Sequence, residues 1–243
     1  YVKSKIKSCE EVGFESTMIK RDTSITEAEL LEIVDKLNKD DDIDGFIVQL
    51  PLPPHIDELK ITMAINPDKD VDGFHPLNFG KLAQGLPCFI PATPLGILLM
   101  LERYNIPTAG KKCVVVGRSN IVGTPMSILM SRKGKVGDCT VTLTHSRTEN
   151  IEKECLEADI LIAAIGKPHF IKENMVKEGA VVIDVGINRV EDALSPKGSK
   201  IVGDVDFDNV APKCSYITPV PGGVGLMTVT CLMLNTLKAA KEK

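Results

Sequence analysis

Residues 113–123 read Cys-Val-Val-Val-Gly-Arg-Ser-Asn-Ile-Val-Gly, and this stretch decides the fold. Its run of valines ends abruptly at Gly117, and a helical pattern that carries a second glycine, Gly123, begins directly afterwards. A buried strand that turns tightly into a helix is typical of a parallel sheet in which the helix N-terminus faces a phosphate. The glycine spacing differs from Gly-x-Gly-x-x-Gly, so the stretch alone also fits a tight turn without a ligand.

Further strands extend this turn into a sheet. Short runs of apolar and β-branched residues predict strands at 112–117, 139–144, 159–164, 180–185 and 214–217, and helical patterns separate the first four. Parallel strands joined by crossover helices form a doubly wound sheet. We therefore expect a Rossmann-like dinucleotide-binding domain over residues 98–225.

The rest of the chain predicts a second α/β domain. Helices are expected at 2–12, for about fifteen residues after a capping box of Thr26 and Glu29, and at 56–65, 94–105 and 226–242, and a buried strand is expected at 44–50. The last helix could pack back on the first domain. The predicted fold class is thus two α/β domains, residues 1–97 completed by 226–243 and residues 98–225, with a ligand cleft between them.

Composition argues against several classes of protein. The 243 residues are 43% hydrophobic, which disfavours disorder, and the net charge of −4 disfavours a general nucleic-acid binder. No apolar run approaches the roughly 18 residues that span a bilayer, so we expect no membrane association and no signal peptide. Seven scattered cysteines without a Cys-x-x-Cys pair predict reduced thiols in a cytoplasmic protein, and four dispersed histidines predict no metal site.

The end of the second predicted strand indicates which dinucleotide binds. NAD sites usually place an acidic residue there, which binds the ribose 2′-hydroxyl. This chain instead has Thr144-His145-Ser146-Arg147-Thr148, which suits a 2′-phosphate because it is basic and rich in hydroxyls. Each basic side chain alone also fits a solvated loop. Together with Arg118 from the first turn, they predict NADP rather than NAD.

Two glycine-containing loops are further candidates for the ligand site. Asp184-Val-Gly-Ile-Asn188 ends a predicted strand, where ligands of open α/β sheets bind, and Ile187 could cover a nicotinamide ring. A buried turn is the plain alternative. Pro219-Val-Pro-Gly-Gly-Val-Gly225 is too apolar for a flexible linker, and its glycines permit close approach of a backbone or a ligand. Its amides could therefore face a ligand at the domain junction.

Candidate acid–base chemistry lies at the beginning of the chain. Tyr1 and Lys5 are four residues apart, so they share one face of the predicted helix. A lysine shielded from water beside an aromatic ring has a lowered pKa and can exchange protons near neutrality. Taken alone, Lys3, Lys5 and Lys7 fit an ordinary solvated helix face. Gln49 could orient Lys5 or a ligand, or it could cap the end of its strand by bonding to backbone.

The segment Asp70-Val-Asp72-Gly73 allows two interpretations. Its carboxylates could bond backbone groups within a turn, or Asp72 could face a ligand that carries several N–H donors. Two carboxylates separated by one residue could also suggest a metal. No further series of oxygen ligands follows them, so we expect no metal here.

Six motifs, in this order, resemble the bifunctional methylenetetrahydrofolate dehydrogenase/cyclohydrolase family. They are Tyr1-Val-x-x-Lys5, Gln49-Leu-Pro-Leu-Pro53, Lys69-Asp-Val-Asp-Gly73, Pro91-x-Thr-Pro94, Gly117-Arg-Ser-x-Ile-Val-Gly123 and Pro221-Gly-Gly-Val-Gly225. The motifs span nearly the whole chain, and the second and last are highly specific as a set. The resemblance implies oxidation of 5,10-methylenetetrahydrofolate by NADP to the methenyl form, followed by hydrolysis to 10-formyltetrahydrofolate.

The resemblance also implies a role for each matching residue. Lys5 is the general acid/base of hydrolysis, Gln49 holds and tunes Lys5, and Asp72 bonds the N–H groups of the pterin. The other folate-site residues are Tyr1, Val48, Leu50, Pro221, Gly222, Gly223, Val224 and Gly225. The dinucleotide site comprises Gly117, Arg118, Ser119, Ser146 and Ile187, to which the basic loop adds His145. A homodimer paired through the nucleotide domain and a place in purine biosynthesis are further family expectations.

The chain departs from the family pattern at several points. Ala92 stands where the family often has Cys, and Leu226 stands where Pro usually follows the last glycine. The segment from Gly117 to His145 is a few residues longer than in many members of the family. The strand and helix that normally precede the first tyrosine are absent, which suggests a truncated chain.

Three alternatives to the bifunctional enzyme remain. The first is a dehydrogenase that lacks the hydrolytic activity, which the presence of Lys5, Gln49 and Asp72 disfavours. The second is a non-enzymatic dinucleotide-binding module. The third is a short-chain reductase that uses Tyr1 and Lys5. In short-chain reductases this pair follows the nucleotide fold, whereas here it precedes it.

Overall fold

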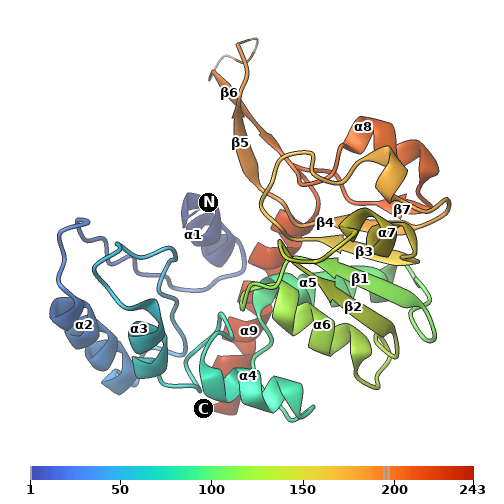
Figure 1. The fold of residues 1–243 in the computed structure, drawn as a ribbon. Coiled ribbons are helices and arrows are strands. Elements are labelled where there is room, and N and C mark those ends of the chain that lie inside the picture. The colour runs from blue at the N-terminus through green and yellow to red at the C-terminus, as the bar shows by residue number, and fades with distance from the viewer. Residues whose placement is uncertain (1, 194, 196–197) are drawn as a thin grey trace. The chain divides into compact units, whose positions relative to one another are not determined.

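The valine-rich run Lys112–Val116 is strand β1 of a five-stranded parallel sheet in the computed structural model, which describes residues 2–193, 195 and 198–243 (Figure 1). The other strands are Thr140–Thr144 (β2), Ile160–Ala163 (β3), Val181–Asp184 (β4) and Tyr216–Ile217 (β7). The strand order β2-β1-β3-β4-β7 confirms the predicted sheet and places its topological switch point between β1 and β3.

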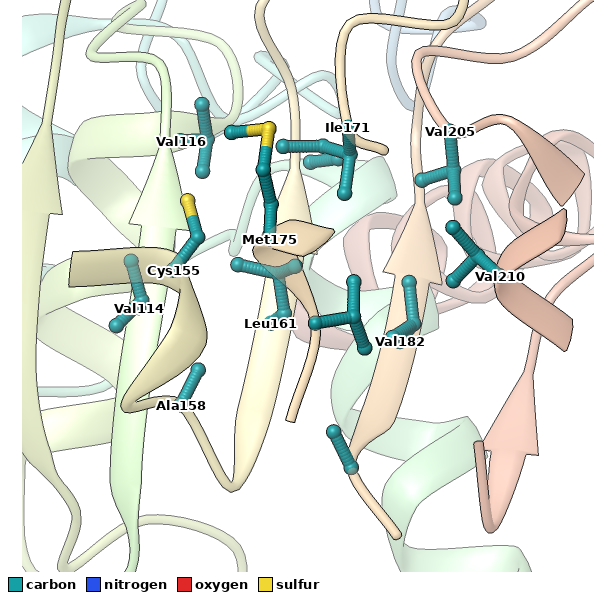
Figure 2. Close-up of a cluster of buried hydrophobic side chains, with 13 residues drawn as sticks. Val114, Val116, Cys155, Ala158, Leu161, Ile171, Met175, Val182, Val205 and Val210 are labelled. Atoms are coloured by element: carbon teal, nitrogen blue, oxygen red, sulfur yellow. The ribbon is translucent and has the colours of Figure 1, made fainter. Parts of the chain in front are cut away.

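Apolar side chains cover both faces of this sheet. On one face, strand residues pack against Cys155 of α7 (Ile151–Leu156), Met175 of the 3₁₀ turn η1 (Glu173–Met175) and Val210 of α8 (Phe207–Val210), as Figure 2 shows. The strand residues of this cluster are Val114, Val116, Leu161, Ala163 and Val182. Alternate strand residues face the opposite way, where α6 (Gly123–Ser131) contacts β1 and β2. Burial on both faces explains the nearly continuous apolar strands.

Two predictions for this part of the chain need correction. The helix expected between β3 and β4 is wrong, because the connection contains only the short turn η1. The antiparallel strands β5 (Asn188–Glu191) and β6 (Ser199–Val202) were not anticipated by the apolar pattern. Their residues are at most partly buried, apart from Val202, so they lack the apolar run by which the central strands are identified.

The beginning of the chain forms four helices, α1 (Val2–Glu11), α2 (Glu27–Lys39), α3 (Glu58–Ala64) and α4 (Pro76–Ala83). The capping box is confirmed, because Thr26 Oγ1 accepts from Glu29 N at 3.2 Å and Thr26 N donates to Glu29 Oε2 at 2.8 Å. The strand expected at 44–50 is wrong. Within this segment only Phe46 forms a β-bridge, with Asp70, because no other described segment pairs with it over several consecutive residues.

Two helices, α5 (Ala92–Arg103) and α9 (Val224–Glu242), join the two compact units of the chain. The first unit runs to Ala92 and resumes at Val229–Lys243, and the second is Thr93–Thr228. Predicted boundaries after residue 97 and before residue 226 fall inside these helices. The C-terminal part of α9 packs on the first unit as expected, since Asn235 Nδ2 donates to Val71 O at 2.8 Å and to Ile90 O at 2.9 Å.

The described helices include none that combines the length and apolarity required to cross a bilayer. The seven cysteines, all of which lie in the described ranges, form no disulfide.

The turn after β1 leaves no room for a side chain at either of its glycines. Gly117 has a φ of +112°, and a Cβ there would overlap the carbonyl oxygen of Ala164, which follows β3. A Cβ on Gly123, the first residue of α6, would overlap the carbonyl oxygen of Gly117. The two glycines therefore let the backbones of β1, α6 and the β3 loop approach one another directly.

We predict that Gly123→Ala lowers the free energy of unfolding by about 2–4 kcal/mol, because the new methyl group forces the strand and helix apart. Thermal and urea unfolding of the whole chain measure this loss. Gly80→Ala is the matched control. Gly80 lies within α4 with open space around its Cα, so alanine there should stabilise the chain by about 0.5–1 kcal/mol. Equal effects of the two substitutions would contradict the close approach at Gly123.

Candidate active site

The loops after β1 and β2 form the first part of the candidate site. Val116 and Thr144 are register partners at the ends of these strands, and Gly117 N donates to Thr144 O at 2.9 Å. Arg118 and Ser146, each two residues beyond its strand, are exposed. Within the described chain, neither side chain has a hydrogen-bond partner. Both loops leave the same edge of the sheet, so the two predicted phosphate ligands project from neighbouring positions.

Ser119 and His145 have structural bonds in the same loops. Ser119 Oγ accepts from Val122 N at 3.1 Å and from Gly123 N at 3.4 Å, so it satisfies donors at the beginning of α6. His145 Nδ1 accepts from Arg147 N at 3.2 Å, which leaves Nε2 as the ring nitrogen that can face a ligand. The predicted contacts of both residues with a dinucleotide stay predictions, and their observed role is to shape the loops.

The residues at this edge fit NADP by their chemistry. A guanidinium, an imidazole and a hydroxyl are donors, and residues 145–148 contain no carboxylate that would repel a 2′-phosphate. The helix N-terminus after Gly117 supplies backbone N–H groups for a pyrophosphate.

The loop after β4 and the glycine-rich loop meet within the second unit. Ile187 is 63% exposed, unusual for isoleucine, and its Cδ1 lies 3.8 Å from where a Cβ on Gly225 would stand. Val224 and Gly225 begin α9, and the Val224 side chain is buried. Pro221, Gly222 and Gly223 form the turn before the helix. The structure thus brings the predicted nicotinamide cover and the predicted folate loop together.

Lys5 and Gln49 form a hydrogen-bonded pair in the first unit. Lys5 Nζ donates to Gln49 Oε1 at 3.2 Å, and Gln49 Nε2 donates to Leu50 O at 2.8 Å. The second bond fixes the amide so that its oxygen faces the lysine. Gln49 therefore both orients Lys5 and bonds to backbone, although the strand that it was expected to cap is not formed. Lys5 is buried, whereas Lys7 on the same helix is exposed, so the solvated-face interpretation is wrong for Lys5.

Lys5 and Asp72 interact electrostatically across this site. Burial lowers the pKa of the Lys5 ammonium, and attraction to the Asp72 carboxylate opposes part of that change. Burial raises the pKa of Asp72 to about 6, the charge of Lys5 opposes this, and the charge of Asp70 adds to it. The pair thus combines a lysine that releases its proton more easily with a carboxylate that titrates nearer neutrality than usual.

Asp70 and Asn235, of which only Asp70 was predicted to stabilise this turn, hold the backbone around Asp72 in place. Asp70 is buried, and its carboxylate accepts from Gly73 N at 3.2 Å, from His75 N at 2.8 Å and from the side chain of Asn78 at 3.0 Å. Asn235 of α9 binds the carbonyl of Val71, as described above. The turn interpretation is therefore correct for Asp70. Asn235 carried no sequence signal, because it is distant in the chain and sits in an ordinary helical pattern.

Val48 and Leu50 line a small cavity together with Asp70 and Asp72. Tyr1 lies outside the described residues. No group of three potential metal ligands occurs in the part of the chain that the structure describes.

Two family models match the chain. The model for the catalytic domain of tetrahydrofolate dehydrogenase/cyclohydrolase matches residues 1–72, and the model for its NAD(P)-binding domain matches residues 91–243. Among curated proteins, the bifunctional protein FolD of Bacteroides thetaiotaomicron is 62% identical over 242 residues, with 100% of this chain and 83% of that protein covered. The FolD protein of Flavobacterium johnsoniae is 63% identical over 243 residues, with 100% and 82% covered.

Solved structures give the same result. The bifunctional FolD dehydrogenase/cyclohydrolase of Campylobacter jejuni has a TM-score of 0.93 and 48% identity, and the match covers 100% of this chain and 83% of that one. The methylenetetrahydrofolate dehydrogenase-cyclohydrolase of Trypanosoma brucei, solved with NADP and an inhibitor, has a TM-score of 0.94 and 36% identity, covering 100% and 82%.

We predict that Asp72→Asn lowers the pKa of Lys5 further, because the carboxylate that favours the charged ammonium is gone. Labelling with an amine-reactive anhydride across a pH series, read by mass spectrometry, gives the midpoint for each lysine. The Lys5 midpoint should lie below the ordinary value for a lysine in the wild type, and lower still in the variant. A Lys5 midpoint that rises in the variant would contradict the assigned coupling.

Proposed function

The chain belongs to the tetrahydrofolate dehydrogenase/cyclohydrolase family, and from this premise we propose that its first unit performs hydrolysis and its second unit binds the redox cofactor. The enzyme oxidises 5,10-methylenetetrahydrofolate to 5,10-methenyltetrahydrofolate with NADP and hydrolyses that product to 10-formyltetrahydrofolate. The observation that supports the division of labour is the buried Lys5, which donates to Gln49 and lies beside Asp72. A dehydrogenase without hydrolase activity would not require a buried lysine held in this way.

Lys5 is the proposed acid/base of hydrolysis. Water attacks the electrophilic methenyl carbon, and Lys5 Nζ takes the proton that the water releases. The lowered pKa of Lys5 makes the neutral amine accessible, and the hydrogen bond from Lys5 Nζ to Gln49 Oε1 holds that nitrogen in one place. The same lysine can return a proton to the folate nitrogen when the ring opens.

Asp72 is the proposed anchor of the pterin. Its carboxylate accepts hydrogen bonds from pterin N–H groups, and the fixed backbone around it sets their direction. Val48, Leu50 and residues 221–225 supply the apolar and backbone surfaces of the folate site, and Tyr1 covers the ring, as the family resemblance implies. Binding through Asp72 serves both reactions, because both act on the same folate.

The redox step depends on orientation more than on proton transfer. When bound, NADP would supply the acceptor for the hydride that leaves the methylene carbon. Arg118, His145 and Ser146 would hold its 2′-phosphate, Gly117 would let the pyrophosphate approach the turn before α6, Ser119 fixes that turn, and Ile187 would exclude water from the nicotinamide ring. The methenyl carbon that results is cationic and needs no further activation before hydrolysis.

We also propose a cytoplasmic homodimer that contributes one-carbon units to purine biosynthesis. The absence of disulfides among the seven cysteines supports a reducing compartment. Pairing through the nucleotide-binding unit is supported by its two-stranded β5–β6 sheet, whose edges are available for contacts.

Lys5→Met should reduce hydrolysis of methenyltetrahydrofolate by about 10²- to 10⁴-fold, because the side chain can no longer take the proton. The loss of methenyl absorbance measures this rate. Lys7→Met is the matched control on the same helix. Lys7 is exposed and pairs with Glu11 at 3.4 Å, so its removal should leave hydrolysis unchanged. Full hydrolysis in the Lys5 variant would refute its role.

The double variant Arg118→Ala, Ser146→Ala should weaken NADP binding by about 10- to 100-fold and NAD binding by less than about threefold, because only NADP carries the 2′-phosphate. Calorimetric titration measures both dissociation constants. Lys133→Ala, an exposed cation that follows α6 and precedes β2, is the control and should change neither. Equal losses for the two dinucleotides would place the 2′-phosphate elsewhere.

A further inference from the structure

Two buried carboxylates lie between the loops at the carboxyl edge of the parallel sheet, and neither has an assigned role. Asp184 is the last residue of β4, and Asp204 follows β6. Their exposed fractions are 2% and 0%. An ionised carboxylate this deep is unfavourable unless several donors surround it.

Backbone and side-chain donors from two segments, one after β3 and one after β4, surround the carboxylate of Asp204. Its Oδ2 accepts from Ile165 N at 2.8 Å and from Gly166 N at 2.9 Å, both in the loop after β3. Its Oδ1 accepts from Asn188 Nδ2 at 2.8 Å, directly after Ile187. One carboxylate therefore joins the β3 loop to the loop that carries the proposed nicotinamide cover.

Asp184 in turn holds Asp204. Its Oδ1 accepts from Asp204 N and from Gly186 N, and its Oδ2 accepts from Val205 N, each at 2.9 Å. Thr218, in the segment that leads to the glycine-rich loop, accepts from Asp184 N at 2.8 Å through its hydroxyl. We call Asp184 and Asp204 the carboxylate clamp. It ties together the loops that follow β3, β4, β6 and β7.

Two glycines show how closely the clamp is packed. A Cβ on Gly186 would overlap Asp204, and a Cβ on Gly203 would overlap the carboxylate of Asp184. Ile187 is thus bracketed by Gly186, bonded to Asp184, and by Asn188, bonded to Asp204. This explains how a largely exposed apolar side chain is held on a loop instead of collapsing onto the protein.

The core of the unit does not require this arrangement. Apolar side chains of similar volume fill buried space at least as well as buried charges do, and two neighbouring carboxylates repel each other. The contribution of the clamp is to fix the conformation of these loops, because six hydrogen bonds hold segments that otherwise lack regular structure.

We propose that Asp204, fixed by Asp184, is a positioning residue for the dehydrogenase reaction that orients the nicotinamide end of NADP through the β3 loop and Ile187. The clamp leaves the 2′-phosphate end to Arg118 and Ser146, which lie on loops it does not bond. The inference rests on the proposed binding of NADP at this edge. In this proposal the loops after β1 and β2 bind the 2′-phosphate end of the dinucleotide, and the loops after β3 and β4 position its nicotinamide end.

Asp204→Asn tests this with little change in volume. An amide cannot accept from Ile165 N, Gly166 N and Asn188 together, so the two loops should lose their fixed positions. The dissociation constant of NADP should rise at least tenfold and dehydrogenase kcat should fall. Binding of adenosine 2′,5′-bisphosphate, which has the 2′-phosphate but no nicotinamide, should stay within twofold of wild type. Hydrolysis of added methenyltetrahydrofolate should also stay within twofold, since Lys5 is in the other unit.

Two further variants complete the experiment. Asp206→Asn makes the same chemical change two residues away, at a carboxylate bonded to Lys172 and Asn209, and should leave all these values unchanged. Asn188→Ala removes one donor to the clamp and should weaken NADP binding in the same direction but less, which keeps the test informative if the Asp204 variant does not fold.

Parallel weakening of NADP and adenosine 2′,5′-bisphosphate would overturn the proposal, because a general loss of structure affects both ligands. Unchanged NADP binding would overturn it as well. Failure of the proposed function has a different signature. A wild-type protein without methylenetetrahydrofolate-dependent NADPH formation would refute the activity, whereas the comparison of the two nucleotides requires no folate.

Discussion

The nucleotide-binding unit depends on a direct contact of backbone with backbone at the end of β1. Gly117 lies against the carbonyl of Ala164, and Gly123 lies against the carbonyl of Gly117, so two glycines bring a strand, a helix and the β3 loop to one point. This point is also where the strand order reverses, which in open parallel sheets is where ligands bind. The backbone contact at these two glycines therefore also places the N-terminus of α6 beside the basic loop that follows β2.

The first unit solves a different physical problem, which is to keep a lysine inside the protein. An isolated ammonium would be too costly to bury. Gln49 supplies an acceptor, and Asp72 supplies an opposing charge that is itself only partly stabilised. Burial lowers the pKa of Lys5 and raises that of Asp72, and the charge of each group opposes the shift of the other. A lysine that is fully paired in a strong salt bridge would be a poor acid/base.

The limits of sequence reasoning follow from the range over which each signal acts. The strands of the sheet are predictable because burial on both faces produces continuous apolar runs. The capping box at Thr26 is predictable because its partner is three residues away. The strand predicted at 44–50 is wrong because a strand needs a neighbouring strand, and the local sequence does not show whether one is present. The local sequence likewise does not show Asn235 at the Asp72 turn or the contact of Asp184 with Asp204, which depend on the completed topology.

The chain uses Asp-Val-Asp twice, at 70–72 and 204–206, and the comparison separates structure from chemistry. In both copies the first aspartate is buried and accepts hydrogen bonds from surrounding backbone N–H groups. The second differs, because Asp72 faces Lys5, whereas Asp206 pairs with Lys172 at the surface. Burial also raises the pKa of Asp184 to about 6, the value reached by Asp72, although the carboxylate of Asp184 is enclosed by backbone donors. A raised pKa therefore reports burial in both cases. What distinguishes a proton-active site from a clamp is the partner, a titratable amine in one unit and fixed backbone N–H groups in the other.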